Sequence, residues 1–232
     1  MPKTAAETLQ LVKDNLSEYA WSKQPLYHSL MNDKFNQRQL QYFAMQWSVF
    51  PLHNHHYHGN LYVHCPDPSW RRRIAEVVYE EGTGRLFAND MEHSRLWYLF
   101  SDAVGVSREQ MATFQFCPGS MAMRVYFEWV CCRTFLEGVS AHMLAGEAQV
   151  PGVMGKVARN LQNQNGLSAE AVSFFDVHEV ADEDHSSVGY DLLADFAKTE
   201  ADFDLVVRTV RDYSGIERLM NDDIYRGMQK LA

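Results

Sequence analysis

Three side chains of types that bind metals recur along one short stretch of the sequence. His178, Asp182 and His185 stand at positions i, i+4 and i+7 of V-H-E-V-A-D-E-D-H-S-S-V. At 100° per residue of an α-helix, these side chains fall within about 60° of one another. The same face continues upstream through Ala171 and Phe174, which indicates that it faces a core. Buried imidazoles and carboxylates are costly unless they are paired, so the face is either one wall of a metal site or an ordinary hydrogen-bonded face.

A metal site in a helical bundle needs further ligands from the facing helices. Two segments offer them. The first, V-Y-E-E-G-T-G-R-L-F-A-N-D-M-E-H, contains Glu80, Glu81 and His93, and the second, L-A-G-E-A-Q-V-P, contains Glu147. Considered alone, each of these glutamates could also be an ordinary charged residue near the end of a helix.

In combination, these motifs resemble those of the haem-oxygenase-like diiron oxidases, relatives of the pyrroloquinoline-quinone synthesis protein C and of TenA-like proteins. The resemblance rests on E-x-G-x-G, H-S-x-L, G-E-A-Q-V-P and F-F-x-x-H-x-x-x-D-x-x-H, in that order, and spans about residues 25–196. It implies a seven-helix fold without haem, two Fe(II) ions per chain with Mn(II) as the alternative metal, and O2 as the oxidant.

The resemblance also implies a set of iron ligands: Glu80, His93, Glu147, His178, Asp182 and His185. The gap between the first glutamate and its histidine is longer here than in the family, so Glu81 is the alternative to Glu80. Glu80 is preferred because it reproduces E-x-G-x-G. Carboxylate and imidazole donors suit Fe(II) and Mn(II), whereas six ligands would over-fill a tetrahedral zinc site.

The hydrophobic period is helical, and no convincing alternation typical of strands occurs. We therefore predict an all-α, haem-oxygenase-like bundle of seven to eight helices, forming a single domain over residues 1–232. The expected helices include 36–56, 69–82, 89–105, 120–145 and 168–185, with one or two more in 188–232.

Several polar residues outside this ligand set have simple explanations. Four histidines, His53, His55, His56 and His58, point in different directions around one helix, and we expect them not to be ligands, although one of them could border the pocket.

Two further polar pairs, Arg124 with Glu128 and Arg133 with Glu137, have the i, i+4 spacing of ion pairs. The alternative is that Arg124, Arg133 or Lys156 binds a substrate carboxylate.

Composition excludes several classes of protein. The net charge is −9 and no long basic run occurs, which argues against nucleic acid or an anionic membrane as the partner. The four cysteines lack metal-site spacing and are expected to be reduced thiols. No apolar leader or long apolar run is evident, so we expect a cytoplasmic protein. A homodimer is left open.

We therefore expect a non-haem diiron oxidase or oxygenase that uses O2 on a small carboxylate substrate, an amino acid or its derivative, in secondary metabolism. The reaction would be an N-oxygenation, an oxidative C–C cleavage or a desaturation. One alternative is oxidative decarboxylation of a fatty acid at the same site. The others are a cofactor-less oxidase and a metal-free helical binding domain.

Overall fold

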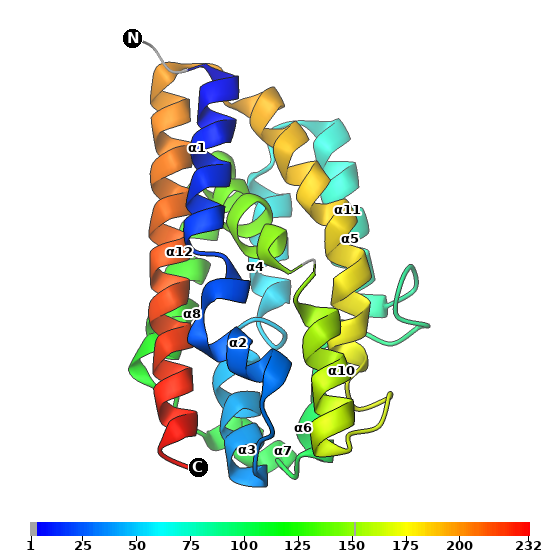
Figure 1. Ribbon diagram of the computed structural model, residues 1–232. Helices are drawn as coiled ribbons and strands as arrows, with labels where there is room; N and C mark the ends of the chain where they lie inside the picture. The colour runs from blue at the N-terminus through cyan, green and yellow to red at the C-terminus, as the bar shows by residue number, and fades with distance from the viewer. Residues whose placement is uncertain (1–3, 151) are drawn as a thin grey trace.

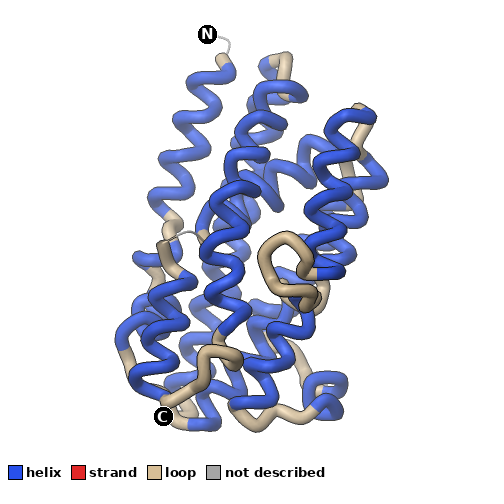
Figure 2. The backbone as a smooth tube through the Cα atoms, turned by 90° about the vertical axis from the view of Figure 1, so that its right-hand side faces the viewer, coloured by secondary structure: helices blue, strands red, loops and turns tan. Residues whose placement is uncertain are grey.

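The computed structural model describes residues 4–150 and 152–232, with side chains apart from those of 180–189 and 192. All the regular elements in these described residues are helical (Figure 2). The first half contains α1 (Ala5–Glu18), η1 (Trp21–Lys23), α2 (Pro25–Asn32), α3 (Gln37–Gln46), η2 (Trp47–Val49), α4 (Asn54–His64), α5 (Pro68–Thr83), α6 (His93–Ala103) and α7 (Arg108–Thr113). The second half contains α8 (Pro118–Cys131), α9 (Phe135–Val139), the π-helix η3 (Ser140–Gly146), η4 (Glu147–Gln149), α10 (Met154–Asn165), α11 (Ser173–Phe196) and α12 (Glu200–Gln229).

The longest of these helices, α12, forms one side of the bundle. It runs beside α1, and α8 packs against it, whereas α5, α10 and α11 lie on the opposite side (Figure 1). A Cβ atom at Gly119, near the start of α8, would lie 2.8 Å from Cα of Met220 in α12. The absence of a side chain at Gly119 therefore allows α8 to approach the backbone of α12 closely.

Aromatic side chains fill the core between these two sides. The Trp97 ring lies 5.2 Å from that of Trp47 and 4.9 Å from that of Phe174, between ring centroids. Both tryptophans and Phe174 are buried. Offset and edge-to-face contacts of this kind stabilise a core beyond its buried area. They fix the first turn of α11, one turn before His178.

The all-α prediction is confirmed, but several predicted helices are divided. The segment 36–56 forms α3, η2 and α4, with a break around Pro51, which has no N–H to donate to a helix. The segment 120–145 forms α8, α9 and η3, because the chain leaves the helix after Cys131 and restarts at Thr134. The Thr134 side chain caps α9 by accepting a hydrogen bond from the Glu137 amide. The described residues therefore contain twelve α-helices rather than seven or eight.

Two predicted helix starts were also wrong. The helix expected at 89 begins only at His93, because Asn89 and Asp90 have positive φ angles of 51° and 62°. Ser168 does not cap α11. Its hydroxyl accepts a hydrogen bond from the Ala171 amide within a turn, and the helix begins at Ser173. Within the described residues, no helix is long and apolar enough to cross a membrane.

Candidate metal centre

A first group of metal-binding side chains is contributed by α5, α6 and α11. Nδ1 of His93 lies 3.0 Å from Oε1 of Glu81. The rings of His93 and His178 are 4.7 Å apart between centroids. Glu81, His93 and His178 each offer one donor atom within 4.8 Å of the others. We call these three residues the first cluster.

Glu80, next to Glu81 in α5, has a different environment. Its carboxylate accepts hydrogen bonds from the backbone amides of Leu86 (2.6 Å) and Phe87 (3.0 Å). Nε2 of His93 lies 3.2 Å from its Oε1. Glu80 is fully buried and therefore anchors the loop between α5 and α6 while it fixes one side of the His93 ring. The two adjacent glutamates thus have distinct positions, with Glu81 in the cluster and Glu80 behind His93.

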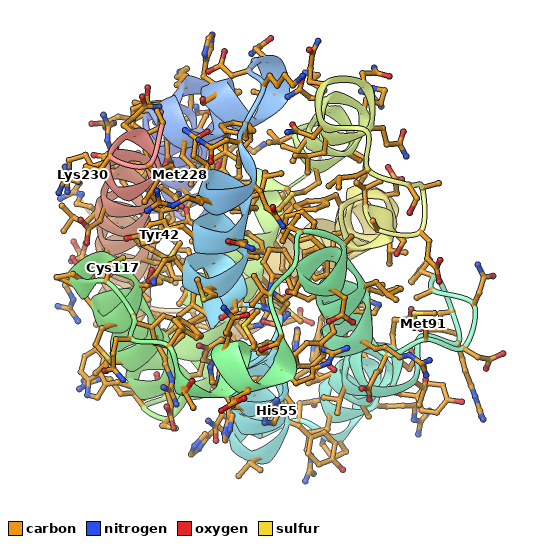
Figure 3. The ribbon with its side chains drawn as sticks, turned by 90° about the horizontal axis from the view of Figure 1, so that it is seen from below. Tyr42, His55, Met91, Cys117, Met228 and Lys230 are labelled. Atoms are coloured by element: carbon orange, nitrogen blue, oxygen red, sulfur yellow. The ribbon has the colours of Figure 1, made fainter. Side chains whose placement is uncertain are left out.

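The loop that Glu80 anchors depends on Gly84. Gly84 has a φ of +64°, and a Cβ atom there would lie 1.9 Å from the carbonyl oxygen of Met91. The loop stands out from the bundle between α5 and α6, with Met91 at the periphery (Figure 1, Figure 3). It returns to the bundle at His93, so the closure at Gly84 sets where α6 begins.

The imidazoles of the first cluster are oriented by neighbouring acceptors. Nδ1 of His178 lies 2.7 Å from the carbonyl oxygen of Phe174, which makes this nitrogen the protonated one in a neutral ring. Nε2 of His93 can donate to Glu80 in the same way. A metal-binding histidine usually donates its second N–H to a carboxylate or carbonyl, which fixes the ring for the metal. Both rings have that arrangement.

The charges of His93 and Glu81 shift each other's protonation, and the charge of Glu80 also acts on His93. Burial disfavours the protonated form of His93, but the carboxylates of Glu81 and Glu80 outweigh it and raise its pKa. Burial would raise the pKa of Glu81, but the neighbouring His93 lowers it well below its usual range. The carboxylates lie on either side of His93, 3.0 Å from Nδ1 and 3.2 Å from Nε2, and favour a positive charge beside them, either a proton on His93 or a metal ion.

A second group of metal-binding side chains surrounds Glu147. Its Oε1 lies 3.3 Å from Nε2 of His58 and 3.2 Å from Nδ1 of His142. The two imidazole rings are 4.1 Å apart between centroids. All three residues are buried and each offers one donor atom within 4.8 Å of the others. We call His58, His142 and Glu147 the second cluster.

The π-helix η3 brings His142 and Glu147 together. Residues five apart would be separated by about 140° around an α-helix. A π-helix has wider turns with i→i+5 hydrogen bonds, and η3 spans Ser140–Gly146, directly before Glu147. The wider winding returns position i+5 to the side of position i. The sequence spacing therefore carries no signal for His142 under an α-helical period.

Both clusters border one cavity. Glu81 and His178 line it from the first cluster, and His142 and Glu147 line it from the second. The remaining walls are mostly apolar: Trp21, Trp47, Phe50, Phe127, Val150, Met154 and Phe174, with Asn54, Gly146, Tyr213 and Glu217. Burial raises the pKa of Glu217 to about 8. The cavity thus combines buried metal-type donors with aromatic walls and one neutral carboxyl group.

The other sequence-predicted residues lie elsewhere. Asp182 and His185 belong to α11, but their side chains are outside the described residues. Arg124, Arg133 and Lys156, the substrate-binding candidates, are not among the residues that line the cavity described above.

The surroundings of these basic residues also bear on the predicted ion pairs. Nε of Arg133 pairs with Glu137 at 2.8 Å, as predicted. The pair predicted between Arg124 and Glu128 does not form among the described contacts, and the Arg124 guanidinium lies 5.8 Å from the centre of the Phe116 ring. Lys156 is exposed on α10 and lines a separate surface depression with Arg159.

The donor set fits a transition metal of the iron type. Carboxylates and neutral imidazoles are the ligands that suit Fe(II) and Mn(II). A metal about 2.1 Å from each donor places neighbouring donors about 3.0–3.4 Å apart. The contacts of Glu81 with His93 and of Glu147 with His58 and His142, between 3.0 and 3.3 Å, have this separation.

The fold and the buried clusters define an all-helical protein with a central site of metal-binding side chains. A family described as iron-containing redox enzyme, of the haem-oxygenase type, matches residues 41–213. The chain belongs to this family and is an oxidoreductase. The resemblance seen in the sequence is thereby confirmed.

Known relatives agree with this assignment. A Chlamydia pneumoniae protein named 4-aminobenzoate synthase is 27% identical over 189 residues, which cover 80% of each chain. A protein of the same name from Nitrosomonas europaea is 24% identical over 186 residues, covering 75% of this chain and 73% of that one. A solved TenA homologue from Pseudomonas syringae, 11% identical, has a TM-score of 0.80 and covers 96% of each chain, which shows the fold alone.

Proposed function

We propose that the chain is a two-iron, O2-dependent oxidase or oxygenase that acts on a small carboxylate-bearing substrate. The observation that carries this proposal is the pair of buried His/Glu clusters that border one cavity. The relatives named 4-aminobenzoate synthase support an aromatic amino-acid-like product, 4-aminobenzoate, as the first candidate.

In this proposal Glu81, His93 and His178 hold the first iron, and Glu147 holds the second. Asp182 and His185, which lie further along α11, remain the proposed additional ligands of the second iron. Bound Fe(II) supplies electrons and open coordination positions to O2.

The surrounding residues have two further tasks. Glu80 and the carbonyl of Phe174 hold the rings of His93 and His178 in a fixed orientation through their second nitrogens. The aromatic rings of Trp47 and Phe50 help to keep water out of the cavity, which protects a reactive site from unproductive reactions. Orientation and exclusion of water are what this chain itself contributes to the reaction.

A growth experiment tests the product even while the substrate is unidentified. The chain is expressed in a bacterial strain that requires 4-aminobenzoate for growth. We expect the wild-type chain to restore growth, Glu81→Ala and His178→Ala to fail, and His55→Ala, at an exposed position of α4 (Figure 3), to restore it. Restored growth with both ligand variants would contradict a metal-dependent function. No growth with the wild type would exclude the aminobenzoate product.

A second experiment tests the irons and O2. The protein is loaded with Fe(II) under anaerobic conditions, its iron is counted, and O2 consumption and products are followed by mass spectrometry with amino acids and fatty acids as candidate substrates. We expect two irons per chain and products that form only with O2. Products that form equally well without iron would favour a cofactor-less oxidase, and an absence of iron binding would favour a metal-free domain.

A further inference from the structure

The second cluster contains two histidines that the sequence motifs did not include among the ligands. His58 comes from α4, and His142 comes from the π-helix η3, so two separate elements converge on Glu147. Their exposed fractions are 1% and 3%, and that of Glu147 is 8%. Burying three metal-type donors in contact with one another is costly unless a partner satisfies them.

Three of the four ring nitrogens of these histidines have no hydrogen-bond partner, whereas Nε2 of His58 is hydrogen-bonded to Oε1 of Glu147 at 3.3 Å. Neither ring nitrogen of His142 makes a hydrogen bond, although Nδ1 lies 3.2 Å from Oε1 of Glu147. Nδ1 of His58 also has no hydrogen-bond partner. A ring packed solely for structure would leave buried nitrogens unpaired, at a cost of about 1–3 kcal/mol for each.

The surroundings of His142 disfavour a positive charge on its ring. Burial lowers the pKa of His142, and the neighbouring His58 lowers it further, against the attraction of Glu147. Neutral imidazole is the form that ligates a metal. The charge of Glu81 also acts on His142, and His58 acts on Glu81, so the two clusters are near neighbours.

We propose that His58, His142 and Glu147 form a binding site for a divalent first-row transition metal. The proposal deepens the proposed function, on which it rests, because it assigns two imidazoles to the second iron. The donor separations of 3.2 and 3.3 Å match those around a single ion. The second ion would then have more nitrogen donors than carboxylate-rich two-iron sites provide.

The experiment counts metal ions and does not depend on activity. Metal-free protein is titrated with Fe(II) under anaerobic conditions, and separately with Co(II), whose visible absorption reports its ligands. Bound metal is then measured by elemental analysis. We expect two ions per chain in the wild type and one in a double variant, His58→Gln with His142→Gln. Glutamine retains the size and polarity of the site, and circular dichroism checks that each variant folds.

Two control variants separate the sites. Glu81→Ala is expected to retain one ion with the absorption spectrum of the second cluster, and His55→Ala is expected to bind two. His55 lies in the same helix as His58 but is exposed. Two ions with an unchanged Co(II) spectrum in the double glutamine variant would overturn the proposed site.

The experiment also distinguishes failure of this site from failure of the two-iron function. If the wild type binds a single ion and only the double variant loses it, the second-cluster site stands and the two-iron function fails. If only Glu81→Ala loses that single ion, the second-cluster site is overturned. A wild type that binds no ion overturns both.

Discussion

His142 and Glu147 are five residues apart in sequence, and their side chains are 3.2 Å apart in the structure. The π-helix between them makes this contact, because an α-helix would direct the two side chains to different sides. π-Helical turns occur frequently at functional sites. Here the turn places a carboxylate and an imidazole on the wall of the central cavity.

Substitutions of the two neighbouring glutamates of α5 are expected to have different effects. Glu80→Ala leaves the amides of Leu86 and Phe87 without their acceptor, so the free energy of unfolding should fall by about 3 kcal/mol. Glu81→Ala should lose one metal ion with a smaller change in stability. Urea unfolding of the metal-free protein and metal analysis measure the two effects. If Glu80→Ala lost metal without losing stability, Glu80 would be a metal ligand and would not anchor the loop.

Gly84 and Gly166 provide a matched pair of backbone substitutions. Their φ angles are +64° and +68°, but a Cβ atom meets the Met91 backbone at Gly84 and no atom within 4 Å at Gly166. Gly166→Ala should therefore cost only the left-handed strain, about 1–2 kcal/mol. Gly84→Ala should cost clearly more and weaken metal binding at His93. Thermal unfolding and metal titration compare the two variants, and equal losses would show that the Met91 contact is unimportant.

Stability should depend on pH through Glu217. Its pKa is raised from 4.5 to about 8 by burial, so the folded protein retains a proton that the unfolded chain releases. Retaining this proton lowers the free energy of unfolding, but not below pH 4.5, where the unfolded chain is protonated as well. This cost grows by about 1.4 kcal/mol per pH unit from 4.5 towards 8.

Glu217→Gln removes this cost and retains an acceptor for the indole N–H of Trp21, which donates to Glu217 at 2.8 Å. The variant should therefore be more stable than the wild type at about pH 8, with little gain at about pH 4.5. Urea unfolding at both pH values tests this. A gain of the same size at both would show that the carboxyl group does not titrate as described.

Metal binding should stabilise the fold by an amount that grows with the logarithm of the metal concentration. An ion present at about 100 times its Kd adds about 2.7 kcal/mol, which raises Tm by several degrees. We expect Fe(II) or Mn(II), added anaerobically, to raise Tm in the wild type and in His55→Ala, with a smaller rise in His178→Ala. A chelator should reverse the effect. The same rise in all three proteins would indicate binding away from the first cluster.

The sequence predicted the helical fold and His178 because both follow the α-helical period. It favoured Glu80 over Glu81, whereas the structure places Glu81 in the first cluster. That difference depends on the amides of a loop whose path Gly84 determines. The sequence could not find His142, whose contact with Glu147 requires a π-helix. His58 is one of four histidines in one segment, and the sequence does not distinguish them. Only the packing of α4 shows that His58 is buried and His55 exposed.

The loop between α5 and α6 is fastened where it leaves and re-enters the bundle, by Gly84 against Met91 and by Glu80 beneath Leu86 and Phe87. The amides of Ala88 and Asp90 also donate to the carbonyl oxygen of Gly84, whereas the side chain of Leu86 is exposed. Side-chain substitutions at Leu86 should therefore be tolerated without moving His93. The loop thus offers an exposed position at which the side chain can be varied in engineering.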